Sequence, residues 1–491
     1  MWNKDTLCDL VHDKLKDYLF IVVSNREPYV HIRSEQAIQC TIPASGLTVA
    51  LDPVMQACGG TWIAHGSGDA DKEVVDSVNK ISVPPDNPKY SLKRVWLSKE
   101  DVDGYYYGFA NEALWPLCHI VYTRPIFRES NWNVYKKVNE SFASNVLEEV
   151  GDRKAFVFIQ DYQLALVAKM IKARNDKIIT AQFWHIPWPN PEAFRICPWQ
   201  KEILEGLLSN DLLGFHIRYN CNNFMDTVNR VLEARVDFER YEITFNNHKT
   251  AIRPFPISVD FEEFSRAAQS DNITAEIDKI KTALGLQDEL IGIGIERFDY
   301  TKGIPDRFRA IDRFFEKYPQ YLGKMTFIQA GVTSRIHIDA YKNLNKEIES
   351  LVEQINWKYR SSRWKPIILL RENLPQVTLL ALRRMADFCI VSSLHDGMNL
   401  VAKEFVASRF DENGVLILSP FTGSARELTD ALLVNPYATD YFAEAIKTAI
   451  EMPEDERQNR MRKMRNIVQE NNIYKWAGDI ISDLVKFEFG G

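Results

Sequence analysis

The sequence predicts an α/β protein made of two doubly wound, Rossmann-like domains, and three observations predict it. Short apolar runs alternate with stretches of helical periodicity, as in parallel sheets whose strands are joined by crossover helices. The 491 residues are too many for one ordinary core, so two or three domains are expected. The alternation divides into two series near residues 257–270. Ligands of such sheets bind outside the carboxyl ends of the strands, so two facing halves would form an interdomain active-site cleft.

The N-terminal domain is expected to span residues 1–258. Its expected strands are short apolar runs, at residues 18–24, 155–160, 178–184 and 211–215. Helical periodicity predicts helices over residues 139–150 and 162–174. Residues 241–253 have the pattern of a β-hairpin. Pro254 and Pro256 follow this hairpin and would stiffen a connector to the next domain.

The C-terminal domain is expected to span residues 259–473. Its expected strands are again short apolar runs, at residues 289–295, 324–330, 366–371, 387–392, 414–419 and 431–435. Helices are expected between them. The last stretch, residues 474–487, is amphipathic, and we expect it to pack back on the N-terminal domain.

Composition and charge exclude several classes of protein. The net charge of -7 argues against nucleic acid as a partner, because neutralising phosphates requires a basic surface. The polar N-terminus is unlike a signal peptide, and no apolar stretch approaches the roughly 18–20 residues of a membrane helix. The seven cysteines form no Cys-x-x-Cys pair, which is typical of reduced thiols in a cytosolic protein. We therefore expect a cytoplasmic protein that contacts no membrane.

No metal site is expected. Asp69 and Asp71 have the spacing of a metal-binding pair but lie in a loop far along the chain from the cationic motif described next. His65 and His119 have no ligand-like partners at metal spacing. The sequence therefore predicts neither a metal nor another cofactor.

Two cations follow the first strand of the second series. Arg297 and Lys302 lie five residues apart in Glu296-Arg-Phe-Asp-Tyr-Thr-Lys302, and a helix is expected to start just after Lys302. Fixed cations stabilise the charge that develops on a diphosphate leaving group without a metal. The alternative, an ordinary solvated pair at a strand end, is less favoured because a second motif accompanies the first.

The second motif is His395-Asp-Gly-Met-Asn-Leu-Val-Ala-Lys-Glu404. An Asp-Gly turn at Asp396 is expected to open a helix whose free amides face an anion, and Glu404 follows two turns later. The residues expected to present those amides are Gly397, Met398, Asn399 and Leu400. The alternative makes Asp396 a simple N-cap and Glu404 an exposed helix residue.

Three further segments of the first half carry candidate residues. His185 ends an expected strand and enters a loop stiffened by three prolines, which favours a role in a catalytic cleft over a core histidine. Arg26 follows the first strand and would either bind an acceptor phosphate or pair with a surface acid. The stretch that contains Tyr106 and Trp115 is either aromatic core or a set of donors to phosphate oxygens.

With these motifs the chain resembles the trehalose-6-phosphate synthase family over roughly residues 18–487. The resemblance implies the two-Rossmann-domain glycosyltransferase (GT-B) architecture. It also implies transfer of glucose from a nucleotide-glucose, with UDP-glucose favoured, to glucose 6-phosphate. The product would be α,α-trehalose 6-phosphate, formed with retention of configuration. In that family the leaving phosphate oxygen is thought to take the acceptor proton, so no carboxylate nucleophile is needed.

The resemblance also implies roles for individual residues. Arg297 and Lys302 would bind the donor diphosphate and assist catalysis. Asp396 would hold hydroxyls of the donor glucose and Glu404 the ribose. His185 would lie against the transferring glucose and Asp161 would contact sugar hydroxyls. The residues implied to bind the acceptor phosphate are Arg26, Tyr106, Trp115 and Arg335.

The chain departs from the family pattern at three places, one of which is a longer insertion between Glu27 and Thr41 that would form a longer loop over the active site. The usual Gly-Gly-Leu loop reads Ala44-Ser45-Gly46-Leu47, where Gly46 would approach the donor, and Gln160 stands where the family commonly has His. These changes leave the acceptor open, with glycerol 3-phosphate as the alternative in a glucosylglycerol-phosphate synthase. A non-catalytic regulatory subunit that binds sugar phosphate is a third hypothesis, which the intact donor motifs disfavour.

Three further expectations concern the whole chain. No Asp-x-Asp-Gly-Thr motif of a phosphatase occurs, so the product is expected to stay phosphorylated. The expected partners are small-molecule substrates only. The sequence leaves the nucleotide base, allosteric effectors and oligomeric state open, a homo-oligomer included.

Overall fold

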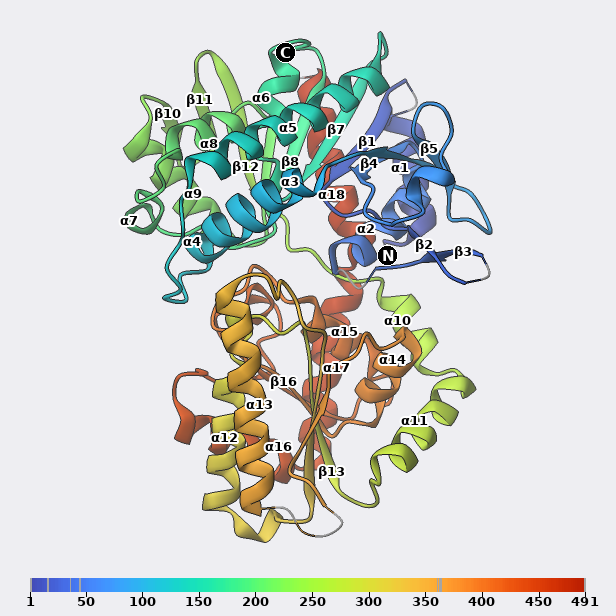
Figure 1. The fold of residues 1–491 in the computed structure, drawn as a ribbon, viewed down its shortest axis with the longest axis vertical. Helices are drawn as coiled ribbons and strands as arrows, with labels where there is room; N and C mark the ends of the chain where they lie inside the picture. The colour runs from blue at the N-terminus through green and yellow to red at the C-terminus, as the bar shows by residue number, and fades with distance from the viewer. Residues whose placement is uncertain are drawn as a thin grey trace. The chain divides into compact units, whose positions relative to one another are not determined.

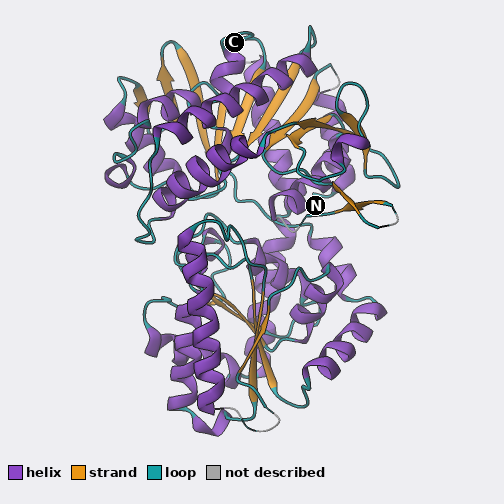
Figure 2. Ribbon diagram, viewed as in Figure 1, coloured by secondary structure: helices purple, strands orange, loops and turns teal. Residues whose placement is uncertain are grey.

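The structure, a computed structural model, describes residues 2–15, 17–35, 37–43, 46–359, 361 and 364–489. It divides into two compact units. The N-terminal unit comprises residues 1–257 together with 473–491, and the C-terminal unit comprises residues 258–472. Each unit is a mainly parallel sheet with helices packed on both faces (Figures 1 and 2).

The sheet of the N-terminal unit has the strand order β10-β11-β12-β9-β8-β7-β1-β4-β6-β5. Its centre is parallel, and only the outer pairs β10-β11, β11-β12 and β5-β6 are antiparallel. The strands are β1 (Leu19–Ser24), β4 (Thr61–His65), β5 (Lys80–Val83), β6 (Tyr90–Val95), β7 (Ala155–Gln160), β8 (Ile179–Phe183), β9 (Leu212–Phe215), β10 (Arg235–Asp237), β11 (Glu242–Phe245) and β12 (His248–Pro254). A separate hairpin joins β2 (Val30–Arg33) to β3 (Ile38–Thr41).

The helices of this unit connect the strands and cover the sheet. They are α1 (Lys4–Leu15), α2 (Gly46–Cys58), α3 (Lys99–Asp101), α4 (Trp115–His119), α5 (Glu129–Val150), α6 (Val167–Lys172), α7 (Pro191–Phe194), α8 (Gln200–Leu207), α9 (Arg218–Val231) and α18 (Ile473–Phe489), with the 3-10 helices η1 (Asp71–Glu73) and η3 (Tyr162–Leu164) and the π-helix η2 (Val102–Leu114). Helix α18 returns from the C-terminal unit and packs on α1, α2 and β8. Trp476 of α18 donates a hydrogen bond to the carbonyl of Phe255 at 3.2 Å.

The sheet of the C-terminal unit is wholly parallel, with the order β15-β14-β13-β16-β17-β18. Its strands are β13 (Leu290–Ile295), β14 (Met325–Ala330), β15 (Ile367–Leu370), β16 (Phe388–Val391), β17 (Val415–Leu418) and β18 (Leu432–Leu433). In chain order this is 3-2-1-4-5-6, the order of dinucleotide-binding sheets. The order reverses between β13 and β16, and ligands of such sheets bind at that switch point.

Two hydrophobic cores flank this sheet because successive strand residues point to opposite faces. Ile328, Cys389 and Leu418 belong to one core, whereas Phe327 and Phe388 belong to the other. The helices on the first face are α10 (Phe261–Ala268), α11 (Asp271–Leu284), α14 (Gln376–Met385), α15 (Leu400–Ser408) and α17 (Glu454–Glu470). Those on the second are α12 (Ile304–Lys317), α13 (Asp339–Tyr359) and α16 (Thr439–Glu451) (Figure 1). The short helices η4 (Tyr300–Lys302), η5 (Pro319–Tyr321) and η6 (Gly423–Arg426) complete the unit.

A strand or helix is present at each place where the sequence predicts one, with shifted ends except for β7, which has the predicted bounds. The predicted helix 139–150 is the second half of the longer α5, and the predicted helix 162–174 is η3 followed by α6. The region from β2 to β6 and the π-helix were not predicted.

Candidate functional site

Cationic and acidic side chains meet at the switch point of the C-terminal unit. Arg297 and Lys302 follow β13, and Asp396 follows the neighbouring strand β16. The ammonium of Lys302 lies 2.6 Å from Oδ2 of Asp396, and both side chains are 13% exposed. Ser393 and Asn399 each donate to the same carboxylate oxygen at 3.1 Å. The two sequence motifs, ninety residues apart in the chain, thus form one site.

Arg297 is the unpaired cation of this site. Its guanidinium makes no ion pair or side-chain hydrogen bond with any residue in the described part of the chain, although the side chain is half-buried. Its charge acts on Asp299 nearby. Burial alone would raise the pKa of Asp299, but the positive charges of Arg335 and Arg297 hold that pKa below its usual range. A half-buried cation without a carboxylate partner is suited to bind an anion.

The residues from Asp396 to Leu400 lead into the expected helix. Helix α15 begins at Leu400, with Asn399 as its N-cap, so Asp396 lies before the helix start. Asp396 instead forms an isolated parallel bridge with Thr422, which holds the chain extended before the helix. Asn399 has φ 76°, and its side chain accepts from the Ala402 amide at 3.2 Å.

The amides of this segment remain available. Within the described residues, the backbone amides of four successive residues donate to no acceptor: Gly397, Met398, Asn399 and Leu400. They lie at the amino end of α15, where the helix dipole favours negative charge. The contact between Lys302 and Asp396 joins this segment to the loop that carries Arg297.

A buried arginine that sequence reasoning missed holds the base of this site. Arg307 on α12 is 1% exposed and lies 2.5 Å from Glu296 in an ion pair. It also donates to Gln329 at 2.7 Å and to Ser392 at 2.9 Å, so it links α12 to β14 and to the end of β16. Burial raises the pKa of Glu296, and the charge of Arg307 opposes that rise. The sequence signal that could have found Arg307 is an arginine at a core-facing position of an amphipathic helix.

Gly303 lets the chain turn between Lys302 and α12. Its φ is +62°, and a Cβ there would lie 2.3 Å from the carbonyl oxygen of Ser392. Only glycine combines this left-handed conformation with so close an approach of two backbones. Gly303 therefore fixes where Lys302 points.

Glu404 lies on α15, and its carboxylate accepts from Arg383 of α14. Arg383 is 2% exposed, and its guanidinium lies over the ring of Phe264. The side chain of Arg383 is 3% exposed and that of Glu404 13%, so this ion pair is largely shielded from solvent.

Arg335 lies after β14, with φ 51°. Its Nη1 donates to the hydroxyl of Tyr341 at 2.5 Å and lies 3.5 Å from Oδ2 of Asp299. The structure therefore brings Arg335 to the loop that carries Arg297 and Lys302. It belongs to the C-terminal unit, whereas the other three residues expected to bind the acceptor belong to the N-terminal unit.

In the N-terminal unit the candidate residues also gather at a switch point, where β1 and β7 are neighbours. Arg26 follows β1 and donates to the hydroxyl of Tyr106 at 3.0 Å, with its guanidinium over that ring. Asn111 donates to the carbonyl of Tyr106 at 2.6 Å and accepts from Tyr162 at 2.9 Å. Tyr162 lies next to Asp161, so hydrogen bonds connect the residue after β1 to those after β7.

Only part of the aromatic stretch belongs to the core. Tyr105 and Phe109 are buried in the core, whereas Tyr106 contacts Arg26. All three lie in the π-helix η2, a geometry that often occurs at functional sites. Trp115 is buried, with its ring 5.8 Å from that of Tyr162.

Asp161 and His185 lie beside each other at the ends of β7 and β8. Asp161 has φ 71°, a strained value for a residue other than glycine, and its carboxylate accepts from the His185 amide at 3.0 Å. Nε2 of His185 lies 2.9 Å from Oε1 of Gln160. Burial, and then the charge of His216, lowers the pKa of His185 well below its usual range. The imidazole is therefore neutral near pH 7.

The loop that departs from Gly-Gly-Leu is only partly described. Ala44 and Ser45 lie outside the described residues, whereas Gly46 is the first residue of α2.

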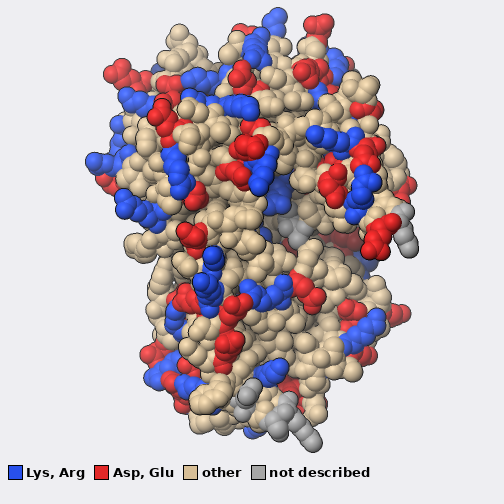
Figure 3. Space-filling model, in the orientation of Figure 1, with Lys and Arg blue, Asp and Glu red and all other residues tan. Residues whose placement is uncertain are grey.

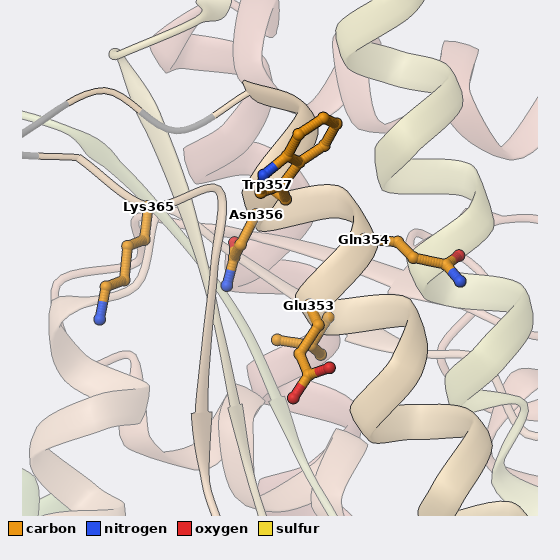
Figure 4. Close-up of a pocket in the computed structure, with 6 residues that line it drawn as sticks. Glu353, Gln354, Asn356, Trp357 and Lys365 are labelled. Carbon is orange, nitrogen blue, oxygen red and sulfur yellow. The ribbon is translucent and has the colours of Figure 1, made fainter.

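A groove elsewhere in the C-terminal unit is separate from this site. Its volume is about 520 Å³, and its lining residues are Val352, Glu353, Gln354, Asn356, Trp357 and Lys365 (Figure 4). Lys365 precedes β15, so the groove lies at the amino edge of the sheet, opposite the carboxyl edge that carries Arg297 and Lys302. The groove is therefore not part of the site that contains Arg297 and Lys302.

The structure was also searched for metal clusters and membrane spans. Among the residues described, no three His, Cys, Asp or Glu side chains are placed to hold a metal ion together. Over the same residues, no helix has the length and apolarity to cross a bilayer. On the face that Figure 3 shows, acidic and basic side chains are interspersed over each unit.

The fold and these residues define a class of protein: two doubly wound units, each with polar and charged residues at its switch point. The model of glycosyltransferase family 20 matches residues 18–486. The chain belongs to glycosyltransferase family 20, which confirms the resemblance and the fold class predicted from the sequence.

Curated relatives cover nearly the whole chain. A bifunctional trehalose-6-phosphate synthase/phosphatase of Thermoproteus tenax is 35% identical over 95% of this chain and 63% of its own length. The chain thus spans less than two thirds of that relative. A UDP-forming α,α-trehalose-phosphate synthase of Pichia angusta is 32% identical over 95% of this chain and 98% of its own.

Solved structures also match this chain over nearly its whole length. One from E. coli, bound with UDP-2-fluoro glucose, has a TM-score of 0.84 at 32% identity and covers 95% of this chain and 99% of its own. A UDP-forming α,α-trehalose-phosphate synthase from Burkholderia xenovorans, in complex with glucose 6-phosphate, has a TM-score of 0.85 at 29% identity, with the same coverage.

Proposed function

We propose that this protein is a retaining glucosyltransferase that moves glucose from UDP-glucose to glucose 6-phosphate and forms α,α-trehalose 6-phosphate. The observation that carries the proposal is the anion site at the β13–β16 switch point. There the unpaired Arg297, Lys302 and four free amides converge. Relatives of which this chain covers nearly the whole length are UDP-forming synthases, and related structures hold a UDP-glucose analogue and glucose 6-phosphate.

In this proposal the C-terminal unit binds the donor. The cations and the amides from Gly397 to Leu400 hold the diphosphate and stabilise its charge as the glycosidic bond breaks. Asp396 holds hydroxyls of the donor glucose, and Glu404, fixed by Arg383, accepts from the ribose hydroxyls. Because fixed cations compensate the negative charge of the leaving diphosphate, the reaction needs no metal and no other cofactor.

The N-terminal unit supplies the groups for the acceptor and the transferred sugar. Arg26, supported by Tyr106, binds the acceptor phosphate, and we assign Trp115 and Arg335 to the acceptor as well. Asp161 and His185 contact sugar hydroxyls, and Gly46 approaches the donor. The leaving phosphate oxygen takes the acceptor proton on the face where the new bond forms, so no carboxylate nucleophile is required.

The test is the release of nucleoside diphosphate from UDP-, GDP- and ADP-glucose, each with glucose 6-phosphate or glycerol 3-phosphate and with a chelator present. We expect release with UDP-glucose and glucose 6-phosphate, undiminished by the chelator. Release with glycerol 3-phosphate alone would mean that glycerol 3-phosphate is the acceptor and that the protein is a glucosylglycerol-phosphate synthase. No release with any pair would leave a regulatory subunit that binds sugar phosphate.

A further inference from the structure

The hydrogen bond between Gln160 and His185 has a defined direction. Gln160 is the last residue of β7 and is fully buried, and His185 follows the neighbouring strand β8. The amide Nε2 of Gln160 lies 3.4 Å from the carbonyl oxygen of Phe158, which only accepts. The amide oxygen therefore faces the imidazole, 2.9 Å from its Nε2. Because an amide oxygen only accepts, Nε2 of His185 carries the proton.

The other groups around the His185 ring do not change the assignment of its proton to Nε2. The carboxylate of Asp161 accepts from the backbone amide of His185 and not from its ring. His216, after β9, donates from Nε2 to the His185 carbonyl at 3.0 Å, and the two ring centroids are 5.4 Å apart. Helix α18, which packs on β8, presents the uncharged Trp476 to Phe183. Nδ1 of His185 makes no hydrogen bond with any residue that the structure describes.

We propose that Gln160 is a positioning residue that holds His185 as its neutral Nε2–H tautomer, so that Nδ1 accepts a hydrogen bond from a sugar hydroxyl in the site. This inference rests on the proposed function, in which His185 contacts the transferred glucose. It deepens that function because it excludes His185 as a proton donor to the sugar. The lowered pKa of His185 agrees with a neutral ring.

The choice of residue at position 160 has a consequence for pH. The histidine common at this position in the family pattern titrates near neutral pH and is able to donate or accept. The amide of Gln160 does not titrate. In this chain the tautomer of His185 is therefore fixed over the whole range in which a histidine partner would change its charge.

The first experiment reads the tautomer directly, by NMR of the whole protein labelled with ¹⁵N at histidine. The His185 signals are identified by their absence in His185→Asn. We expect wild type at pH 7 to show a protonated Nε2 and a bare Nδ1. Gln160→Met keeps the length of the side chain but removes its acceptor, so we expect a mixture of tautomers. A protonated Nδ1 in wild type would overturn the proposal.

The second experiment compares pH profiles of kcat/KM for the donor. Gln160→Glu places a negative charge beside the ring and raises the pKa of His185. We expect the ratio of Gln160→Glu to wild-type activity to fall as the pH is lowered from 8 to 6, because a growing fraction of the His185 rings becomes protonated. Gln160→Met should lower activity by the same factor at every pH.

The ratio to wild type removes the titration of the acceptor phosphate from this comparison. Gln354→Glu, an exposed position on α13, controls for the added charge and should give a constant ratio near one. A constant ratio for Gln160→Glu as well would refute the proposal. Absence of transfer in wild type would instead refute the proposed function, and the NMR result would still decide the tautomer.

Discussion

Arg297 and Lys302, which sequence analysis treats alike, differ in their partners. Arg297 has no acidic partner among the described residues, whereas Lys302 is in contact with Asp396. Removing Arg297 takes away one favourable charge. Removing Lys302 also leaves the Asp396 carboxylate, at the proposed diphosphate site, without its counter-charge.

We therefore expect Arg297→Ala to lower kcat/KM by about two decades, as loss of leaving-group stabilisation does, and Lys302→Ala to lower it further. Adding Asp396→Asn to Lys302→Ala should restore part of the difference, since it removes the uncompensated charge. Steady-state kinetics of the three variants provide the measurement. Arg309→Ala, an exposed ion-pair residue on α12, is the matched control and should stay within a factor of two or so of wild type. Equal losses in the two single variants would contradict this account of Lys302.

Glu27 lies next to Arg26 and makes a buried cluster with Arg94 and Asp71. Arg94 donates to Glu27 at 2.9 Å and lies 2.8 Å from Asp71, and none of the three side chains is more than 1% exposed. Burial first, and then the hydrogen bond and charge of Asp71, raises the pKa of Glu27 to about 8 despite Arg94. Glu27 therefore keeps its proton up to about pH 8 in the folded protein.

A raised carboxyl pKa fixes the sign of a pH effect on stability. The folded protein binds this proton more tightly than the unfolded chain, whose pKa is near 4.5. The stabilisation is complete below pH 4.5 and is lost as the pH rises through about 8. Glu27→Gln imitates the protonated carboxyl, so its free energy of unfolding should fall less between pH 5 and about 8 than that of wild type.

Denaturant unfolding at several pH values measures this difference. Glu73→Gln, which breaks an exposed ion pair with Arg33, serves as the control and should follow wild type. An equal fall in Glu27→Gln and wild type would show that Glu27 is ionised in the folded protein.

At the scale of elements, the turn from η4 into α12 determines the position of Lys302. Gly303→Ala places a Cβ against the Ser392 carbonyl and requires φ +62° of an alanine. Gly285, at φ +69°, has nothing within 4 Å of its Cβ position. Gly285→Ala therefore measures the backbone strain alone, about 1–2 kcal/mol. Gly303→Ala should cost more than this in the free energy of unfolding and should also weaken donor binding, as read by UDP titration. Equal destabilisation by the two variants would mean that Ser392 moves away freely.

Strands and helices could be predicted where their own residues show an uninterrupted apolar pattern. Strand β7, at Ala155–Gln160, has the predicted bounds because all six residues are buried. Strand β6 was missed because Lys93 and Arg94 interrupt its pattern. Both are buried, and Arg94 is compensated by Glu27, 67 residues away, a contact that no local pattern contains. Burial of a charge depends on its partner, and the partner is known only from the fold.

The residues of the candidate site divide in the same way: those with a local sequence signal could be predicted, and those that depend on distant contacts could not. The motifs around Arg297 and Asp396 could be predicted because their residues are adjacent in sequence. The start of α15 could not, since the bridge between Asp396 and Thr422 keeps residues 396–399 out of the helix. The supporting arginines, Arg307 and Arg383, were missed because each acts through a contact more than twenty residues away.

At the scale of the whole molecule, the C-terminal unit is complete in itself. All strands of its sheet and both of its cores come from residues 258–472. We expect a chain of residues 258–472 to unfold cooperatively by calorimetry and to bind UDP. Its affinity should lie within about tenfold of the full chain, because the diphosphate and ribose residues all lie in this unit. Arg297→Ala in the same fragment is the control and should abolish that binding. A fragment without a cooperative transition would contradict the independence of this unit.

The hydrogen bond from Trp476 to the carbonyl of Phe255 has a consequence for how such enzymes diversify. It ties the point where the chain leaves the N-terminal unit to the point where it returns. The whole C-terminal unit is thus an insertion between two neighbouring anchor points. Recombination at those two points would exchange this unit, for which we propose nucleotide-sugar binding, and leave the N-terminal unit, with its C-terminal helix, uncut.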